Sequence, residues 1–167
     1  MTLPGDPDKW NRVYASADHV NLQAAKVLKK NTHLLPAQDQ ALDVACGLGA
    51  NALLMAQHGL AVCAWDISKI AIDKLIALSS TLDCPLSTEV RDITIDPPAP
   101  KTFDVIIVSH FLERSIIPEL ILALRDDGLI FYQTFIRDKI GTSSPRNPEC
   151  RLRRNELISL FESLHIV

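Results

Sequence analysis

Two glycines and three aspartates of this 167-residue chain are the residues whose types and spacing best suit chemistry. The segment 41–51 runs from an apolar stretch that contains Asp43, through a Gly-Leu-Gly turn at Gly47 and Gly49, into a helical pattern. Glycine reaches backbone angles that are closed to other residues, and the first turn of a helix presents unpaired N–H groups to a ligand. This order of residues therefore predicts a pocket for a nucleotide-containing cofactor.

Asp66 and Asp92 follow the next two apolar stretches of the chain. Asp66 comes 17 residues after Gly49, close to the roughly 20 residues expected of a carboxylate that binds ribose hydroxyls. The alternative is that Asp66 only caps the helix after it, but Ser68 already offers a capping side chain. A carboxylate at Asp92 can accept a hydrogen bond from an exocyclic adenine amine.

The charge of Asp43 separates two cofactor classes that the glycine turn alone allows. The segment 47–52 also fits the dinucleotide fingerprint with alanine in its third place. A pyrophosphate disfavours a carboxylate in front of the turn, whereas the ammonium and sulfonium groups of S-adenosylmethionine tolerate one. The sequence therefore favours S-adenosylmethionine, and it leaves an NAD-type oxidoreductase and a non-catalytic cofactor-binding module as alternatives.

The elements that must position these residues alternate between apolar strands and helix-length amphipathic segments, which is the pattern of an α/β sheet. Strands are predicted at about 41–45, 61–65, 86–90, 103–108 and 129–135, with a sixth beginning at 165–167. Helices are predicted after Ser68 and at about 8–15, 20–30, 50–58, 113–124 and 154–164. Pro118 marks either the true start of its helix or a kink in it.

We expect one domain over residues 1–167, with an N-terminal helical cap at 1–36 and an α/β core at 37–167. The predicted fold class is α/β, a Rossmann-like, doubly wound, mostly parallel sheet whose C-terminal strands are incomplete. Right-handed crossovers place helices on both faces of such a sheet, and its ligand lies in the crevice at the carboxyl ends of the strands. The residues at strand ends are therefore the ones that matter for function.

Composition limits the function classes. A net charge of −3 and a pI near 5.9 argue against nucleic acid as a partner. No stretch reaches roughly 18 uninterrupted apolar residues and no signal-peptide core is present, so we expect a cytoplasmic protein with no membrane partner. The four cysteines are scattered, with no C-x-x-C pair and no clustered histidines, which predicts neither a metal site nor a disulfide.

Four segments of the chain resemble class I S-adenosylmethionine-dependent methyltransferases, nearest to the bacterial tellurite-resistance-like branch. They are residues 42–52, 64–68, 91–93 and 103–112, and the resemblance covers most of the chain from about Trp10 to the end. The segment 10–14 also resembles the N-terminal aromatic segment that closes over the pocket in this family. The family fold normally ends with a hairpin of a sixth and a seventh strand, so we expect the chain to be truncated rather than to leave a strand edge uncovered.

The resemblance implies a role for each strand end. Residues 45–49 would line the methionine moiety, Asp66 would bind the ribose and Ile67 would lie against the adenine, with Asp92 on its amine and the Ile93 amide nearby. Ser109 would lie beside the reactive methyl group. The complete set of predicted cofactor-binding residues is Asp43, Ala45, Gly47, Gly49, Asn51, Asp66, Ile67, Asp92, Ile93 and Ser109.

The resemblance also places His110 beside the methyl group. Methyl transfer is an in-line displacement that needs no nucleophilic residue of the protein, only alignment of acceptor and methyl. An alcohol or amine acceptor would need a base, for which His110 is the catalytic candidate, although His110 can equally be a packing residue. A thiolate or a reduced chalcogen would need no base. The motif that methylators of base amines carry after the fourth strand is absent there, and Asp96–Ala99, which resembles it, is interpreted as a rigid loop.

A basic segment at 137–154 completes the candidate site. It holds six basic and two acidic residues, a net charge of +4, and it begins after the fifth predicted strand. Arginine suits oxyanions and carboxylates, so Arg137 and Arg146 are candidate substrate-binding residues, with a solvated loop as the alternative. The predicted function is that of an S-adenosylmethionine-dependent methyltransferase acting on a small-molecule acceptor, namely a thiol, a chalcogen oxyanion or a small acid.

Overall fold

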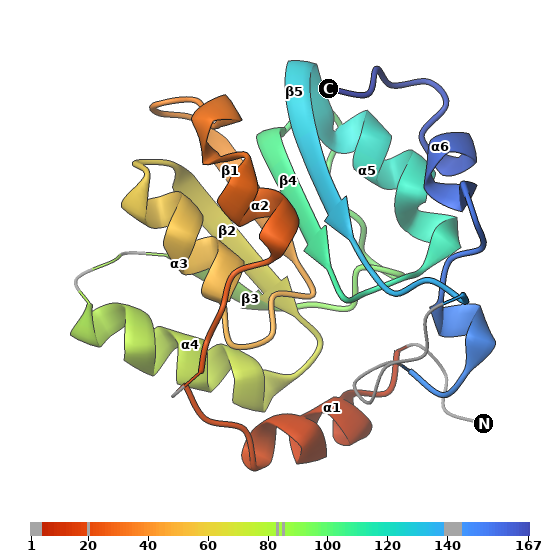
Figure 1. Cartoon of the computed structure of the whole chain (residues 1–167). Coiled ribbons are helices and arrows are strands. Elements are labelled where there is room, and N and C mark those ends of the chain that lie inside the picture. Colours follow the sequence, from red (N-terminus) through yellow and green to blue (C-terminus); the bar gives the residue numbers. More distant parts are fainter. Residues whose placement is uncertain (1–4, 20, 83, 85, 139–144) are drawn as a thin grey trace.

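A five-stranded parallel sheet forms the centre of the computed structural model, with strand order β3-β2-β1-β4-β5 (Figure 1). The structure describes residues 5–19, 21–82, 84, 86–138 and 145–167. The strands are β1 (Gln40–Val44), β2 (Ala61–Asp66), β3 (Ser87–Val90), β4 (Phe103–Ser109) and β5 (Leu124–Gln133). All four strand pairings are parallel, which confirms the predicted Rossmann-like fold.

Helices lie on both faces of the sheet and across its lower end (Figure 1). They are α1 (Pro7–Ala15), α2 (Lys26–Lys30), α3 (Ala50–Gln57), α4 (Lys69–Thr81), α5 (Ile117–Ala123) and α6 (Glu156–Leu160). Short 3-10 turns occur at η1 (Thr32–Leu34), η2 (Arg114–Ile116) and η3 (Pro148–Cys150). Within the described part of the chain, no helix has the length and apolar character needed to cross a membrane.

The core has two layers because successive side chains of a strand point to opposite faces. On one face, Val105 and Ile107 of β4 belong to a cluster with buried residues of α3 and α4. On the other face, Ile106 and Val108 belong to a cluster with Leu120 of α5. The central strands are thus covered on both sides, as the continuous apolar run in the sequence predicted. Their carboxyl ends remain the open edge of the sheet.

The start of α4 fixes the loop after β1. Ser68 caps α4 as predicted, because its Oγ accepts a hydrogen bond from the Ala71 N–H at 3.2 Å. One turn further along, Leu75 is fully buried and packs against Gly49, which has a φ of +83°. A Cβ atom at Gly49 would lie 2.2 Å from Leu75 Cδ1. Only glycine meets both the backbone angle and the close approach.

Two predicted helices are shorter than expected. In place of the helix at 20–30, the structure has α2 at Lys26–Lys30 after a non-helical stretch, and Val20 lies outside the described residues. The Ala25 N–H donates to the side chain of Asn51 at 2.8 Å, which holds the chain extended just before α2. The helix expected at 154–164 is reduced to α6, whose N-cap residue Asn155 has a left-handed φ of 61°.

The boundary between α5 and β5 was also predicted wrongly. Pro118 lies in the first turn of α5, as expected, but the helix ends at Ala123 instead of continuing to 124. The Thr102 N–H donates to the Ala123 carbonyl at 2.9 Å and draws the chain into β5 five residues early. A bulge with Asp127 at a φ of 62° absorbs the extra length.

The sixth strand expected at 165–167 does not form. These residues are exposed, with Ile166 at 78% and Val167 at 88%, and no described strand pairs with them. A strand needs a neighbouring backbone to satisfy its N–H and C=O groups, so an apolar pattern alone is insufficient here.

We expect a Gly49→Ala variant to lose about 3 kcal/mol of unfolding free energy, because it combines a left-handed alanine with overpacking against Leu75. Urea denaturation followed by circular dichroism measures this loss. Gln57→Ala, at the exposed end of α3, is the matched control and should change stability by less than about 0.5 kcal/mol. Equal stability of the two variants would show that the loop does not depend on this contact.

Candidate active site

A cavity of about 330 Å³ opens at the carboxyl ends of β1, β2 and β4, the end that α1 crosses (Figure 1). Its lining includes residues from four separate loops and from α1. Of the residues predicted from the sequence, it contains Ala45, Gly47, Gly49, Asn51, Asp66, Ile67, Asp92, Ile93, Ser109 and His110. The structure therefore brings nearly the whole predicted set together at one crevice.

The floor of the cavity is the loop between β1 and α3. Ala45, Gly47 and Gly49 all have positive φ angles, of 53°, 54° and 83°. For Ala45 this backbone conformation is strained, and such strain persists where surrounding structure holds it in place. The Cys46 N–H donates to the Trp65 carbonyl at 3.0 Å, which ties the loop to the end of β2.

Asp66 connects this loop to the start of α4. Its Oδ2 accepts from the Gly47 N–H at 2.8 Å and its Oδ1 accepts from the Ser68 N–H at 2.8 Å. The residue is only 5% exposed, and burial raises the pKa of its carboxyl while these backbone hydrogen bonds lower it. Since Ser68 caps α4 itself, Asp66 does more than cap a helix, and it places a carboxylate on the cavity wall.

Asp92 stands on the adjacent wall, after β3. Its Oδ1 accepts from both the N–H and the hydroxyl of Thr94, at 3.0 and 2.6 Å. The neighbouring Arg91 stacks over the Trp65 ring at 4.0 Å from its centroid and donates to the carbonyls of Asp96 and Pro97. This agrees with the interpretation of Asp96–Ala99 as a loop, which here holds the Arg91 side chain.

Asp43 does not line the cavity, in contrast to its predicted position. It lies inside β1, fully buried, and its Oδ2 accepts from the Ala52 N–H in the first turn of α3 at 2.9 Å. Its Oδ1 is buried without a hydrogen bond of normal geometry among the described residues, although the Asn51 amide lies near enough to lower the pKa of the carboxyl. Burial has the larger effect and raises the pKa of Asp43 to about 7. The carboxyl is thus directly beneath the glycine loop rather than on its surface.

The end of β4 forms the opposite wall. His110 has a φ of 57°, donates its N–H to the Gln133 carbonyl at 2.8 Å and packs its ring against Phe135. Ser109 Oγ accepts from Asn51 Nδ2 at 2.9 Å. Gln133, which bonds to His110, was not identified from the sequence, because a glutamine at a strand end carries no local signal.

The N-terminal helix α1 contributes two aromatic residues to the cavity, Trp10 and Tyr14. Their rings stack with centroids 6.0 Å apart, and a Cβ atom at Gly47 would lie 2.7 Å from the Tyr14 hydroxyl. Burial raises the pKa of Tyr14, and the nearby Asp66 adds to this effect. The glycine at position 47 therefore allows the aromatic helix to approach the loop closely.

Two side chains fasten α1 to α4. Asn11 Oδ1 accepts from the Ser68 hydroxyl at 2.8 Å. At the other end of α1, Lys74 Nζ donates to the carbonyls of Tyr14 at 2.7 Å and Ala17 at 2.5 Å. A cation suits the carboxyl end of a helix, where carbonyl groups lack partners. Neither side chain was identified from the sequence, since the contact joins residues about 60 positions apart.

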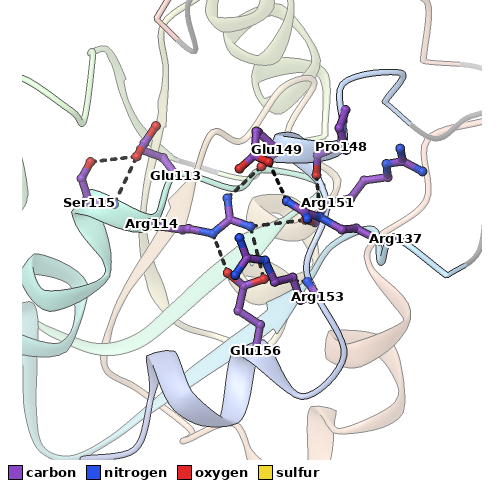
Figure 2. Close-up of polar contacts among 9 residues, drawn as sticks. All are labelled: Glu113, Arg114, Ser115, Arg137, Pro148, Glu149, Arg151, Arg153 and Glu156. Atoms are coloured by element: carbon purple, nitrogen blue, oxygen red, sulfur yellow. Dashed lines mark hydrogen bonds and ion pairs between the residues drawn. The ribbon is translucent and has the colours of Figure 1, made fainter.

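No described residue of the basic segment lines the cavity, so the structure gives no support to the substrate role predicted for Arg137 and Arg146. Arg137 donates to the Pro148 carbonyl at 3.1 Å and to Glu149 Oε1 at 2.7 Å (Figure 2). Arg146 is exposed. Two basic side chains of this segment, Arg137 and Arg154, form ion pairs with its own acidic residues Glu149 and Asp138. Residues 139–144, which include Lys139, lie outside the described residues.

Arg114, in the η2 turn just before α5, forms hydrogen bonds with the same segment and with α6 (Figure 2). Arg114 contacts both oxygens of Glu156, with Nε at 2.6 Å from Oε1, and donates to the Glu149 carbonyl at 2.8 Å. The Arg114 hydrogen bond lowers the pKa of Glu156 to about 2. This network has a structural role, because it fixes the loop between β5 and α6.

Comparison with known proteins identifies a family and a shared fold. A family model described as a methyltransferase domain matches residues 41–128. No curated protein sequence matches the chain significantly. Many solved structures do match, including a protein of Pyrococcus horikoshii with 21% identity and a TM-score of 0.61, over 74% of this chain and 64% of that one.

Two further solved structures cover most of this chain. TehB from Haemophilus influenzae has 22% identity and a TM-score of 0.66 over 93% of this chain, but the chain spans only 54% of TehB. A SAM dependent methyltransferase from Aquifex aeolicus has 17% identity and a TM-score of 0.69 over 95% of this chain and 87% of its own. At these identities the structures establish a shared fold.

We expect Lys74→Met to loosen α1, because it removes the cation from the carbonyls of Tyr14 and Ala17. Hydrogen exchange of the amides of residues 7–15 should accelerate about tenfold, which corresponds to one lost charged hydrogen bond. Lys69→Met is the matched control, since Lys69 lies on the same helix and, among the described residues, pairs with the exposed Asp73 alone. If both variants exchange at the same rate, Lys74 does not hold α1.

Proposed function

The chain belongs to the family of methyltransferase domains, and we propose that it transfers a methyl group from S-adenosylmethionine to a small-molecule acceptor. The observation that carries the proposal is the convergence of the glycine loop, Asp66 and Asp92 on one cavity at the carboxyl edge of a parallel sheet. The family match covers both aspartates, together with the strands that position them.

The cofactor of this family is S-adenosylmethionine. The sequence alone left an NAD-type oxidoreductase open, because segment 47–52 also fits a dinucleotide fingerprint. The family match decides against that alternative. A non-catalytic module with the same fold is disfavoured by the polar groups at the end of β4, which a protein that only binds the cofactor would not need beside the methyl.

The residues of the cavity fit this cofactor. We assign Asp66 to the ribose hydroxyls and Asp92 to the adenine amine, because both carboxylates stand on the cavity wall and carry free acceptor capacity beyond their backbone bonds. Ile67 and Ile93 supply apolar surface for the adenine ring. The glycine loop lets the methionine part approach the main chain, with Ala45 and Gly47 at its surface.

Asp43 has a different role from these contacts. Its buried carboxyl, with one oxygen that lacks a normal hydrogen bond, lies beneath the loop. With a neutral ligand this carboxyl would stay about half protonated at pH 7, because its pKa is about 7. A ligand that carries an ammonium or a sulfonium favours its ionised form, so Asp43 selects a cationic cofactor through charge rather than through direct contact.

The chemistry requires alignment more than acid or base groups. The bound cofactor supplies an electrophilic methyl group on sulfur. The protein holds the acceptor near that methyl and excludes water, and α1 contributes by placing Trp10 and Tyr14 over the cavity. His110 and Ser109 stand where the acceptor must enter, at the end of β4.

For the acceptor we propose a thiol, a chalcogen oxyanion or a small acid. The likeness in fold to TehB supports a place for this chain in the tellurite-resistance-like branch. A small molecule is favoured over a macromolecule because α1, which Asn11 and Lys74 hold in place, covers one side of the cavity. The cytoplasm is the proposed location, and the free thiols of Cys46 and Cys63 agree with a reducing compartment.

Asp66→Ala should weaken S-adenosylhomocysteine binding about 100-fold, since the carboxylate orders two backbone N–H groups in addition to holding the ribose. Isothermal titration calorimetry measures the change, and Asp92→Ala should cost about tenfold. Asp104→Ala, at the opposite end of the strands, is the control and should bind normally. Unchanged affinity in both the Asp66 and the Asp92 variant would contradict the pocket assignment.

Binding of S-adenosylmethionine at pH 6 should release close to one proton from Asp43, whose pKa is about 7 in the free chain and falls when a cation binds above it. At pH 8 the carboxyl is already ionised and no release is expected. Calorimetry in buffers of different ionisation enthalpy counts the protons, and Asp43→Asn should release none.

The same shift has a consequence for stability. Because the folded pKa of Asp43 lies above its ordinary value of 3.8, the stability contributed by the protonated form is present below about pH 4 and is lost as the pH rises through about 7. In Asp43→Asn the free energy of unfolding should not show this decrease between about pH 4 and pH 7.

In the calorimetric experiment, proton release that persists in Asp43→Asn would mean that a group other than Asp43 titrates.

A further inference from the structure

Two side-chain amides connect the N-terminal segment to the acceptor wall of the cavity. Asn51 Oδ1 accepts from the Ala25 N–H at 2.8 Å, and Gln133 Oε1 accepts from the Val27 N–H at 3.0 Å. A backbone N–H can only donate, so each amide must turn its oxygen toward the segment 25–27. The orientation of both amides is therefore fixed by their backbone partners, and their NH₂ groups face the other way.

These NH₂ groups meet the two consecutive residues at the end of β4. Asn51 Nδ2 lies 2.9 Å from Ser109 Oγ, and Gln133 Nε2 lies 3.5 Å from His110 Nε2, the second distance being at the outer limit of a hydrogen bond. An amide NH₂ group only donates, so it meets a lone pair in each case. With this polarity the Ser109 hydroxyl keeps its own proton for another partner, and the contact at His110 is satisfied by a neutral ring whose proton lies on Nδ1.

We propose that Ser109 and His110 act on the methyl acceptor as hydrogen-bond donors, with Asn51 and Gln133 as the positioning residues that fix this polarity. The inference rests on the proposed function and narrows its substrate class. A wall that offers donors suits an acceptor that is already an anion, which is a thiolate or a chalcogen oxyanion. It does not suit an alcohol or amine that must first lose a proton to His110.

The reaction then balances without a protein base. A lone pair of the anionic acceptor forms the new bond to the methyl carbon while the bond from carbon to the sulfonium breaks. The electron pair of the broken bond stays on sulfur, which becomes a neutral thioether, and no proton is transferred. The donors hold the anion in line before the reaction. The catalytic-base role considered for His110 is thereby replaced.

Nuclear magnetic resonance of the nitrogen-15-labelled chain tests the polarity directly. At a pH where the ring is neutral, His110 should show a protonated Nδ1 and an unprotonated Nε2, with its signals identified by their loss in His110→Asn. Gln133→Glu keeps an oxygen for the Val27 N–H but offers an acceptor to His110, so the proton should move to Nε2. A wild-type ring protonated on Nε2 would overturn the proposal.

Kinetics test the substrate class. His110→Asn retains a donor and tolerates the positive φ, so kcat/KM for a thiolate should fall less than about tenfold, whereas His110→Ala should lose about 10-fold to 100-fold. Equal losses in the two variants would contradict a donor role. Thermal unfolding of both variants separates this effect from instability.

An acceptor panel completes the test. Thiols that ionise below the assay pH and reduced chalcogen oxyanions should be methylated, whereas alcohols and amines should not. Separate assays of the thiols and of the oxyanions show which of these two anions the protein methylates. Turnover of alcohols or amines that His110→Asn abolishes would restore the base and sink the proposal. If the proposed function itself were wrong, the wild-type chain would not bind S-adenosylhomocysteine, whereas the tautomer of His110 could still be measured. The two failures can therefore be told apart.

Discussion

The carboxylate of Asp66 is the interaction on which the candidate site depends. It is buried at the end of β2 and accepts one backbone N–H from the glycine loop and one from the start of α4. Removing it would leave two buried donors without partners, which is costlier than losing either bond alone. Asp66 thus holds the loop after β1 and, through Ser68, the first turn of α4. It also places a carboxylate on the wall of the cavity. Structure and ligand recognition share one group, and burial alone would favour its neutral form, so the backbone donors are what keep it suited to a ribose.

The helix α1 depends on this arrangement in turn. Asn11 accepts a hydrogen bond from the Ser68 hydroxyl, and Lys74 donates to the Tyr14 carbonyl at the carboxyl end of α1. Tyr14 lies over Gly47, which has no side chain to prevent this approach. The cavity is therefore built from loops that α4 positions and a helix that α4 holds. On the opposite wall, the side chains of Asn51 and Gln133 hold the segment 25–27 by accepting hydrogen bonds from its backbone N–H groups. Both walls are organised by polar side chains whose partners are fixed, with Asp66 and Asn51 among them buried, which is the condition for a preorganised site.

The sequence allowed prediction of those features that local signals encode. The glycine turn, the aspartate after each strand and the Ser68 cap follow from spacing, and each lies where it was expected, because strand ends of a parallel sheet converge on one edge. Asp43 was predicted at the end of its strand but lies buried inside β1, because the amino-acid sequence does not distinguish a residue inside a strand from one at its end. The substrate role of Arg137 and Arg146 stays a prediction, and charge counting could not show that Arg137 pairs with Glu149 of the same segment. Lys74 and Gln133 act through contacts between distant parts of the chain, for which one sequence holds no signal.

The central claim is that the cavity at the strand ends holds S-adenosylmethionine. Titration of the unmodified chain with S-adenosylhomocysteine and, separately, with NADH in an isothermal calorimeter tests it most directly. We expect saturable binding of one S-adenosylhomocysteine per chain and no heat of binding with NADH. Binding of NADH, or absence of binding with S-adenosylhomocysteine by a chain that is folded by circular dichroism, would contradict the account.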